Sequence, residues 1–182
     1  MKYVALLRGI NVGGKNMIKM ETLRSLVTSL GFENVKSYIN SGNLIFDFRS
    51  PRVGKGVSHD AALAAKIHDA IKTEFGLDIS VMVRSMAEIG DLIKNNPFEG
   101  QFESDKYLHL FFLDSELSNE QERLLMENSS ENERFAISGR SIYCCLKISI
   151  LDSLVGKGFI DKKLKVAATG RNWRTVTKIA EM

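Results

Sequence analysis

The spacing of apolar residues in positions 1–84 predicts four strands and two helices. Short apolar or alternating runs predict strands at Tyr3–Leu7, Val35–Tyr38, Leu44–Phe48 and Ile79–Val83. Apolar residues three and four positions apart predict helices at Leu23–Leu30 and Leu63–Phe75. A glycine follows each helix, where a left-handed cap residue belongs. The resulting order, βαββαβ, is that of a ferredoxin-like unit.

The second half of the chain repeats this order with weaker signals. Strands are predicted at Leu108–Leu113, Glu133–Ile137 and Ser141–Leu146, with a weak last strand at Lys165–Ala168. Two capping boxes predict helix starts at Ser85–Glu88 and Ser118–Gln121. Leu151–Leu164 is apolar enough for a helix, although two glycines weaken it, and a final helix is expected to open at Thr169–Trp173.

We therefore predict an α+β protein made of two ferredoxin-like halves with antiparallel sheets. The first half spans residues 1–84, a helix and linker span 85–105, and the second half with its terminal helix spans 106–182. A chain of 182 residues can bury its core without disulfides or structural metals. Arg49–Ser58, which is rich in glycine and basic residues, is predicted to be a loop.

The charge of the chain is unevenly distributed. Residues 1–58 and 136–182 each hold nine Lys or Arg and three Asp or Glu, whereas residues 85–135 hold four and twelve. If the basic ends meet, they form a positive surface that attracts anions. The alternative is that basic and acidic segments pair with each other or are simply solvated. With no secretory signal and no apolar run of membrane length, we expect a cytoplasmic protein without a membrane partner.

Residue types that carry metal or catalytic chemistry form no clear group. Cys144 and Cys145 are adjacent, so on a strand we expect one core thiol and one more exposed thiol. His59, His68 and His109 are scattered, without the spacing of metal ligands. The sequence therefore predicts no metal and no cofactor. It leaves open whether the protein is an enzyme, because no catalytic constellation can be identified.

The loop Arg8–Asn16 is the most informative segment. From Gly9 to Lys15 it fits the G-x-x-x-x-G-K pattern of a phosphate-binding loop, and it follows a strand. Nucleotide hydrolysis also needs a hydroxyl group for Mg²⁺, but Asn16 stands in that place and the helical pattern begins only later. The antiparallel hairpin predicted after the first helix also disagrees with parallel βαβ winding, so we disfavour a nucleotide hydrolase.

Two interpretations of this loop remain open. In the functional one, the glycine amides between Arg8 and Lys15 bind a phosphate, a carboxylate or a nucleic-acid backbone. In the structural one, the glycines form a tight crossover while Asn11 and Asn16 tie the loop to neighbouring backbone.

Two further segments extend the functional interpretation. The polar turn Asn40–Asn43 can face the same ligand if it lies at the same end of the sheet. At the expected start of the last helix, Arg171 can bind an anion, while Asn172 can either do so or cap the helix. The candidate anion-binding residues are therefore Arg8, Asn11, Gly13, Gly14, Lys15, Asn16, Ser41, Asn43, Arg171 and Asn172.

Four motifs carry a resemblance to a known family. They are Arg8–Asn16, Asn40–Asn43, Asn96–Phe98 and Arg171–Val176, and they resemble domain-of-unknown-function family 1697, an uncharacterised and mainly bacterial family. The resemblance spans nearly the whole chain. It implies an α+β protein of ferredoxin-like halves, and it implies no established activity, cofactor or catalytic residue.

The sequence leads to three functional hypotheses. The first is a small cytoplasmic binding protein whose basic loop takes a phosphate-bearing ligand or a nucleic-acid backbone. The second is an enzyme that acts on an anionic metabolite, with Arg8, Lys15 or Arg171 as electrostatic stabilisers. The third is a protein-interaction module that uses an exposed sheet face or edge.

Overall fold

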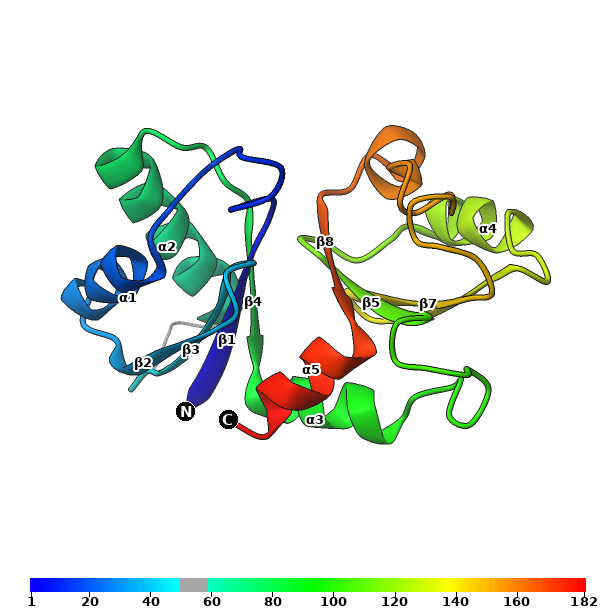
Figure 1. Cartoon of the computed structure of the whole chain (residues 1–182), viewed down its shortest axis with the longest axis horizontal. Coiled ribbons are helices and arrows are strands. Elements are labelled where there is room, and N and C mark those ends of the chain that lie inside the picture. Colours follow the sequence, from blue (N-terminus) through cyan, green and yellow to red (C-terminus); the bar gives the residue numbers. More distant parts are fainter. Residues whose placement is uncertain (50–58) are drawn as a thin grey trace. The chain divides into compact units, whose positions relative to one another are not determined.

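The structure is a computed structural model, and it describes residues 1–49 and 59–182. The predicted loop Arg49–Ser58 lies outside the described residues, apart from Arg49. The chain divides into two units, Met1–Ile89 with Met182, and Gly90–Glu181 (Figure 1). Each unit contains one four-stranded antiparallel sheet, which confirms the predicted α+β class.

The first unit has the predicted βαββαβ order. Its elements are β1 (Lys2–Leu7), α1 (Met20–Ser29), β2 (Glu33–Tyr38), β3 (Asn43–Asp47), α2 (His59–Phe75) and β4 (Val81–Ser85). The strands lie in the order β2-β3-β1-β4, and α1 and α2 lie together on one face of the sheet (Figure 1). The central strand β1 therefore ends between two neighbours, β3 and β4, and the loop that follows it starts from the middle of the sheet.

Apolar residues from the sheet and both helices form the core of this unit. Leu23 and Val27 on α1, and Ile67 and Ile71 on α2, are fully buried, as their helical spacing predicts. Phe32 extends the core by stacking on another aromatic ring, that of Phe46, with 4.6 Å between the centroids. The sheet that carries the β1–α1 loop is thus packed on one continuous apolar core.

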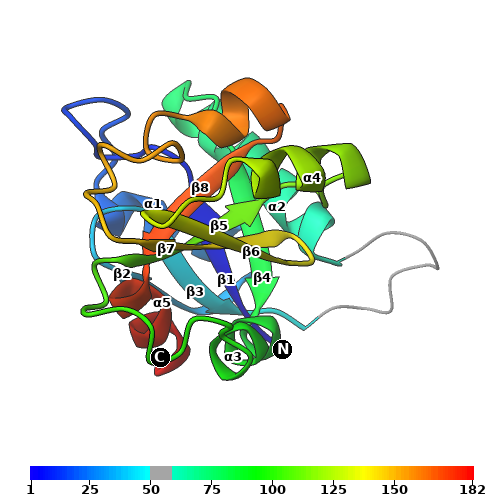
Figure 2. The same cartoon turned by 90° about the vertical axis from the view of Figure 1, so that its right-hand side faces the viewer.

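The second unit repeats the sheet topology. Its elements are α3 (Met86–Lys94), which begins before the division, β5 (Leu108–Leu113), α4 (Asn119–Glu127), β6 (Glu133–Ser138), β7 (Ser141–Leu146), a π-helical turn (Ile160–Leu164), β8 (Ala168–Asn172) and α5 (Trp173–Ala180). The strand order is β6-β7-β5-β8, and α4 lies on one face of this sheet (Figure 2). Both capping boxes are confirmed, at Ser85 with Glu88 and at Ser118 with Gln121.

Two predictions for the end of the chain were wrong. The helix predicted over Leu151–Leu164 is a series of turns that ends in the π-helical turn. A side chain at Gly156 would collide with the backbone oxygen of Ile150, so the chain folds back on itself too closely for a regular helix. The final helix starts only at Trp173, because Thr169 to Asn172 are the last strand, paired with β5.

The prediction of one exposed thiol was also wrong. Cys144 and Cys145 are 0% and 4% exposed, because both faces of β7 are covered. Cys144 lies in the α4-side core, where burial raises the pKa of its thiol well above the usual value. On the other face, the Cys145 thiol donates to the backbone oxygen of Gln101, with Sγ and O 3.8 Å apart, and the Tyr143 hydroxyl donates to that of Leu92 at 2.7 Å.

We expect the turn at Gly42 to be far more sensitive to substitution than an open glycine. Gly42 has φ of +79°, and a Cβ atom there would lie 2.7 Å from Leu7 Cβ and 2.9 Å from Ile10 Cγ1. Gly13 has φ of +57° but no atom within 4 Å of an added Cβ. Overpacking adds about 1–3 kcal/mol to the left-handed conformational cost of about 1–2 kcal/mol that both share.

Urea unfolding of Gly42→Ala and Gly13→Ala measures this difference. We expect Gly42→Ala to lower the free energy of unfolding by about 3 kcal/mol and Gly13→Ala by about 1 kcal/mol. Equal losses of unfolding free energy in the two variants would show that the turn shifts to accommodate the added Cβ atom and would contradict this prediction.

Candidate functional site

The loop after β1 forms a small β-hairpin, residues 11–16, here called the glycine hairpin (dark blue, after β1, in Figure 1). Asn11 N donates to Asn16 O at 3.2 Å, and Lys15 N donates to Val12 O at 3.0 Å. Gly13 and Gly14 at its tip have φ of +57° and +74°. A two-residue type I′ turn requires positive φ at both central positions, so the glycines are needed to form this hairpin.

The side chain of Asn11 fixes the glycine hairpin to its surroundings. Its Oδ1 accepts from Ile18 N at 2.8 Å, while its Nδ2 donates to Ile18 O at 3.0 Å and to Asn40 O at 2.9 Å. The carboxamide therefore pairs with Ile18 as a neighbouring strand would, and it also reaches the turn between β2 and β3, residues 39–42. The backbone of Asn11 is left-handed, with φ of +54°, a conformation that asparagine tolerates well.

Other predicted site residues also have structural partners. Asn16 Nδ2 donates to Gly9 O at 3.1 Å, which closes the base of the hairpin. Asn43 is fully buried, and its Nδ2 donates to Tyr38 O at 3.0 Å and to Ser41 Oγ at 3.2 Å. These contacts agree with the structural interpretation of the asparagines.

The structure brings the loop and the β2–β3 turn together at one end of the first sheet. Leu7 N donates to Gly42 O at 2.8 Å, so the turn lies directly beside the end of β1. On the other side, Arg8 N donates to Ser80 O at 3.0 Å, and the Arg8 residue is half-buried. Two of the predicted segments, the glycine hairpin and the turn, are therefore neighbours.

Three hydrogen-bond donors of the hairpin tip are free. Within residues 1–49 and 59–182, the amides of Gly13 and Gly14 and the ammonium group of Lys15 have no protein partner. All three residues are exposed. The tip therefore presents two backbone N–H groups and one positive charge to solvent, on a hairpin whose asparagine side chains are already engaged.

A hollow of about 490 Å³ lies between the glycine hairpin and the β2–β3 turn. It is lined by Asn11, Met17, Ile18, Lys19, Met20 and Asn40. The sequence offered no direct signal for it, because Met17, Lys19 and Met20 precede the helical pattern and Asn40 belongs to a different loop. A hollow with apolar and basic lining is a suitable place for a ligand.

The β2–β3 turn also contains a strained residue. Ile39 has φ of +48°, although it is β-branched, and its residue is 51% exposed. The left-handed conformation costs an L-residue about 1–2 kcal/mol, and a β-branched residue there is a genuine outlier. Such strain concentrates at functional positions.

Arg171 and Asn172 lie in the second unit. Arg171 is buried on β8, where its Nη1 donates to Thr169 Oγ1 and to Gly170 O, each at 2.8 Å, and burial lowers its pKa to about 10. Asn172 is the N-cap of α5, and its Oδ1 accepts from Thr175 N at 2.9 Å, as the capping interpretation predicts. Both side chains thus have partners within their own unit.

One buried histidine in the second unit has an unused nitrogen. His109 Nδ1 is buried without a hydrogen-bond partner among the described residues, and burial lowers the pKa of this side chain. His109 pairs with Cys144 in the β5–β7 register. These are two residues of metal-ligating type, and no group of three or more His, Cys, Asp or Glu suited to a metal ion occurs in the part of the chain that the structure describes.

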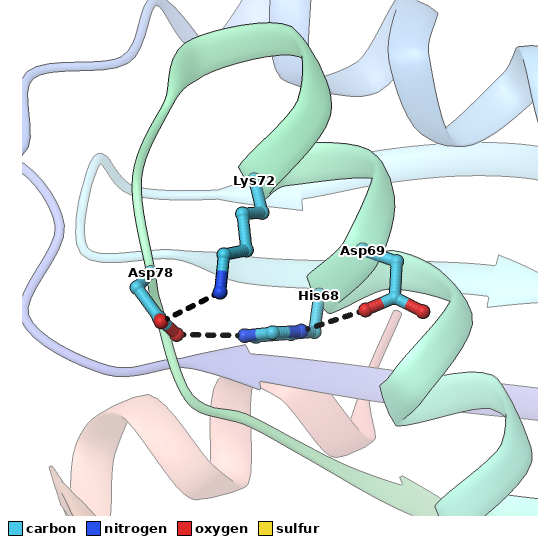
Figure 3. A network of polar contacts seen from close by, with 4 residues as sticks. All are labelled: His68, Asp69, Lys72 and Asp78. Atoms are coloured by element: carbon cyan, nitrogen blue, oxygen red, sulfur yellow. Dashed lines mark hydrogen bonds and ion pairs between the residues drawn. The ribbon is translucent and has the colours of Figure 1, made fainter.

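A charged network joins α2 to the segment before β4 (Figure 3). His68 Nε2 contacts Asp78 Oδ1 at 2.8 Å and its Nδ1 contacts Asp69 Oδ1 at 3.0 Å, while Lys72 Nζ donates to Asp78 Oδ2 at 2.9 Å. The hydrogen bond to Asp78, followed by that to Asp69, raises the pKa of His68. Because this segment leads to Ser80, which accepts from Arg8 N, the network supports one side of the loop.

The architecture defines the class of protein as α+β, with two βαββαβ-like units that each contain a four-stranded antiparallel sheet. The model of a family described as proteins of unknown function, DUF1697, matches residues 1–143, and the chain belongs to this family. No helix of the described residues is long and apolar enough to cross a membrane.

One solved structure supports the same assignment. The chain is similar to the conserved bacterial protein SP0830 from Streptococcus pneumoniae, with 26% sequence identity and a TM-score of 0.74. The similarity covers 99% of this chain and 97% of that one, so it includes both units. None of the curated proteins compared with the chain matches it.

We expect the carboxamide of Asn11 to be essential for the stability of the first unit. Asn11→Asp keeps the acceptor for Ile18 N, but it replaces the donor with a charged oxygen that faces the carbonyl groups of Ile18 and Asn40. Losing two hydrogen bonds and leaving two acceptors unpaired should lower the free energy of unfolding by about 2–3 kcal/mol. Asn16→Asp is the matched control, because it breaks one exposed bond and should cost about 1 kcal/mol or less. A loss no greater for Asn11→Asp than for this control, measured by urea unfolding, would contradict the proposed role.

The His68 network should stabilise the fold more at acidic than at alkaline pH. The folded pKa of His68 is raised above the ordinary histidine value of 6.5, so the folded state holds its proton to higher pH than the unfolded state. Its contribution is therefore complete below pH 6.5 and is lost as the pH rises through the folded pKa. The effect is small, because the side chain of Asp78 is 70% exposed.

Comparison of the wild type with His68→Gln at several pH values isolates this contribution. We expect the free energy of unfolding to differ most at about pH 5.5 and to converge by about pH 8.5, since histidine changes charge in this range. Asp78→Asn should remove most of the same pH dependence, because the Asp78 hydrogen bond is the largest cause of the shift. A difference in the free energy of unfolding between the wild type and His68→Gln that grows with pH would contradict the predicted direction of the effect.

Proposed function

We propose that the protein binds a phosphate group of a nucleotide or nucleic-acid backbone at the tip of the glycine hairpin. Two amides and an ammonium group can surround one phosphate, because backbone N–H groups and lysine are both common phosphate donors. The observation that carries the proposal is that the donors of Gly13, Gly14 and Lys15 are exposed and free, whereas the asparagine side chains of the same hairpin are engaged.

The rigidity of the hairpin supports this function. A flexible lysine on a surface loop loses conformational entropy when it binds, but here the backbone at Lys15 is already fixed by its bond to Val12 O. The type I′ turn also fixes the two glycine amides before a ligand arrives. The tip is therefore organised for an anion without a large rearrangement.

The charge distribution along the chain also favours an anion. The segment from Arg8 to Met20, which follows β1, contains Arg8, Lys15 and Lys19 but no acidic residue. Positive charge concentrated in one segment attracts phosphate groups over a distance of about one Debye length, roughly 8–10 Å in physiological salt. We expect binding to weaken as the salt concentration rises.

The enzymatic hypothesis has less support. A catalytic site for an anionic metabolite would combine basic residues with a carboxylate of altered pKa in one pocket. The hollow beside the hairpin has no carboxylate among its six described lining residues. The pKa of Asp78 is lowered, and its hydrogen bond to His68 is the largest cause. Asp78 belongs to the network on α2, however, and is not among the described residues that line the hollow.

We expect Lys15→Ala to weaken binding of a mixed-sequence single-stranded oligonucleotide about tenfold. Removal of one lysine–phosphate contact should also reduce the slope of log affinity against log salt by about 1. Fluorescence anisotropy with a labelled DNA and a labelled RNA, at about 50 mM and about 200 mM salt, measures both changes.

Lys163→Ala is the matched control for charge. Lys163 is exposed, lies in the second unit and has no protein partner within the described ranges. The Lys163→Ala variant removes the same charge as Lys15→Ala. A larger loss of affinity in Lys15→Ala would therefore identify the hairpin as the binding site. No salt-sensitive binding by the wild type, or equal binding by Lys15→Ala and the wild type, would overturn the proposed function.

A further inference from the structure

We propose that the hollow between the glycine hairpin and the β2–β3 turn binds the base of a nucleoside phosphate. This inference rests on the proposed function, in which the hairpin tip binds the phosphate of the same ligand. The hollow lies at the base of the hairpin, because Asn11, which donates to Asn16 O there, lines it, and so does Met17, the residue that follows the hairpin.

The size of the hollow exceeds what a phosphate group alone requires. Its volume of about 490 Å³ lies within the range of about 300–1,000 Å³ that is typical of pockets for small organic ligands. A phosphate held at the hairpin tip would leave this volume filled with water. A ligand that carries a ring system in addition to the phosphate can occupy both places.

The apolar walls of the hollow suit a flat aromatic ring. Met17 is 67% exposed, and covering a large apolar side chain of this kind is energetically favourable. Ile18, which also lines the hollow, is buried. Met20 is half-buried, and its Sδ lies 3.8 Å from Asn11 Nδ2. Thioether groups make favourable contacts with aromatic rings, and methionine adapts to the shape of its partner.

The polar rim of the hollow suits a base that carries a phosphate. Within the described ranges, the side chains of Lys19 and Asn40 have no hydrogen-bond partner. A free carboxamide offers one donor group and one acceptor, which match the edges of nucleobases. Lys19 adds positive charge and no carboxylate is among the described lining residues, so the charge favours an anionic ligand over a cationic one.

Isothermal titration of the full chain tests the inference. The probes are AMP, GMP, CMP and UMP, together with ribose 5-phosphate, which lacks the base, and adenosine, which lacks the phosphate. We expect at least one nucleotide to bind about tenfold more tightly than ribose 5-phosphate, since the base contributes contacts of its own.

Substitution of Met17 identifies the hollow as the place of the base. Met17→Ala should weaken nucleotide binding about fivefold and leave ribose 5-phosphate unchanged, while Met17→Leu should retain most of the affinity. Met126→Ala is the matched control, because Met126 is another exposed methionine, on α4, and it should leave every affinity unchanged. Met17 is exposed, so these variants are expected to fold, which a thermal unfolding curve verifies.

The outcomes separate this inference from the proposed function. Equal binding of nucleotides and ribose 5-phosphate, or no effect of Met17→Ala, would overturn the base site and leave the phosphate site at Lys15 intact. Adenosine binding as tightly as AMP would overturn the phosphate site and the nucleotide assignment with it. A 5′-phosphorylated tetranucleotide that binds more tightly than the monomer would identify a nucleic-acid strand as the source of the nucleotide, and equal affinity would identify a free nucleotide.

Discussion

The hydrogen bonds of one carboxamide hold the end of the first sheet in place. Asn11 is joined to Ile18 and to the backbone of Asn40 by three hydrogen bonds of 2.8–3.0 Å. Through them, the glycine hairpin and the segment that leads into α1 form one surface with the β2–β3 turn, which is distant in sequence. The hairpin alone would be a short two-residue turn with little independent stability. Its fixed position therefore depends on this side chain.

This arrangement separates the polar groups that build the loop from those that can bind a ligand. Asn11, Asn16 and Asn43 donate to backbone oxygens within the unit, so their hydrogen-bonding capacity serves the fold. Gly13 and Gly14 keep free amides because they are the central residues of the turn and point away from the paired residues, and Lys15 keeps a free ammonium group because its side chain is exposed. Buried or engaged polar groups are costly to redirect, whereas exposed donors exchange water for a ligand at little cost. The same loop can therefore be structural at its base and functional at its tip.

Much of the fold could be predicted from the sequence, because its strongest signals are local. Leu108–Leu113 and Ser141–Leu146 match β5 and β7 residue for residue, since these central strands are apolar on both faces. The last strand was predicted too early, at Lys165–Ala168, because the observed strand Ala168–Asn172 is largely polar and only its pairing with β5 makes it a strand. The turns that replace the helix at Leu151–Leu164 depend on a close backbone contact at Gly156, which no periodicity reveals.

The candidate site was predictable only in part, for the same reason. The ferredoxin-like order places the β1 loop and the β2–β3 turn at one end of the sheet, so their proximity follows from topology. The partner of Asn11 could not be inferred, because any backbone amide within reach would have satisfied the same carboxamide. His68 and Lys72, four residues apart on one helix face, were a usable signal for the α2 network, but Asp78 joins it only through the path of the following segment.

Two residues of the β2–β3 turn have positive φ, but the packing of the fold requires a glycine at only one of them. Gly42 is needed for folding, because its positive φ and its contact with Leu7 leave no room for a side chain. Ile39 has a positive φ as well, yet it is 51% exposed and β-branched, so glycine or asparagine would satisfy the fold at lower cost. Val12 and Met17, 60% and 67% exposed in the neighbouring hairpin segment, likewise gain nothing from their positions in the folded chain alone. Strain and exposed apolar area therefore occur at the same end of the sheet as the free donors of the hairpin. Of these residues, Met17 lines the hollow, so the apolar part of the proposed phosphate-bearing ligand would cover it, whereas Ile39 and Val12 are outside its described lining.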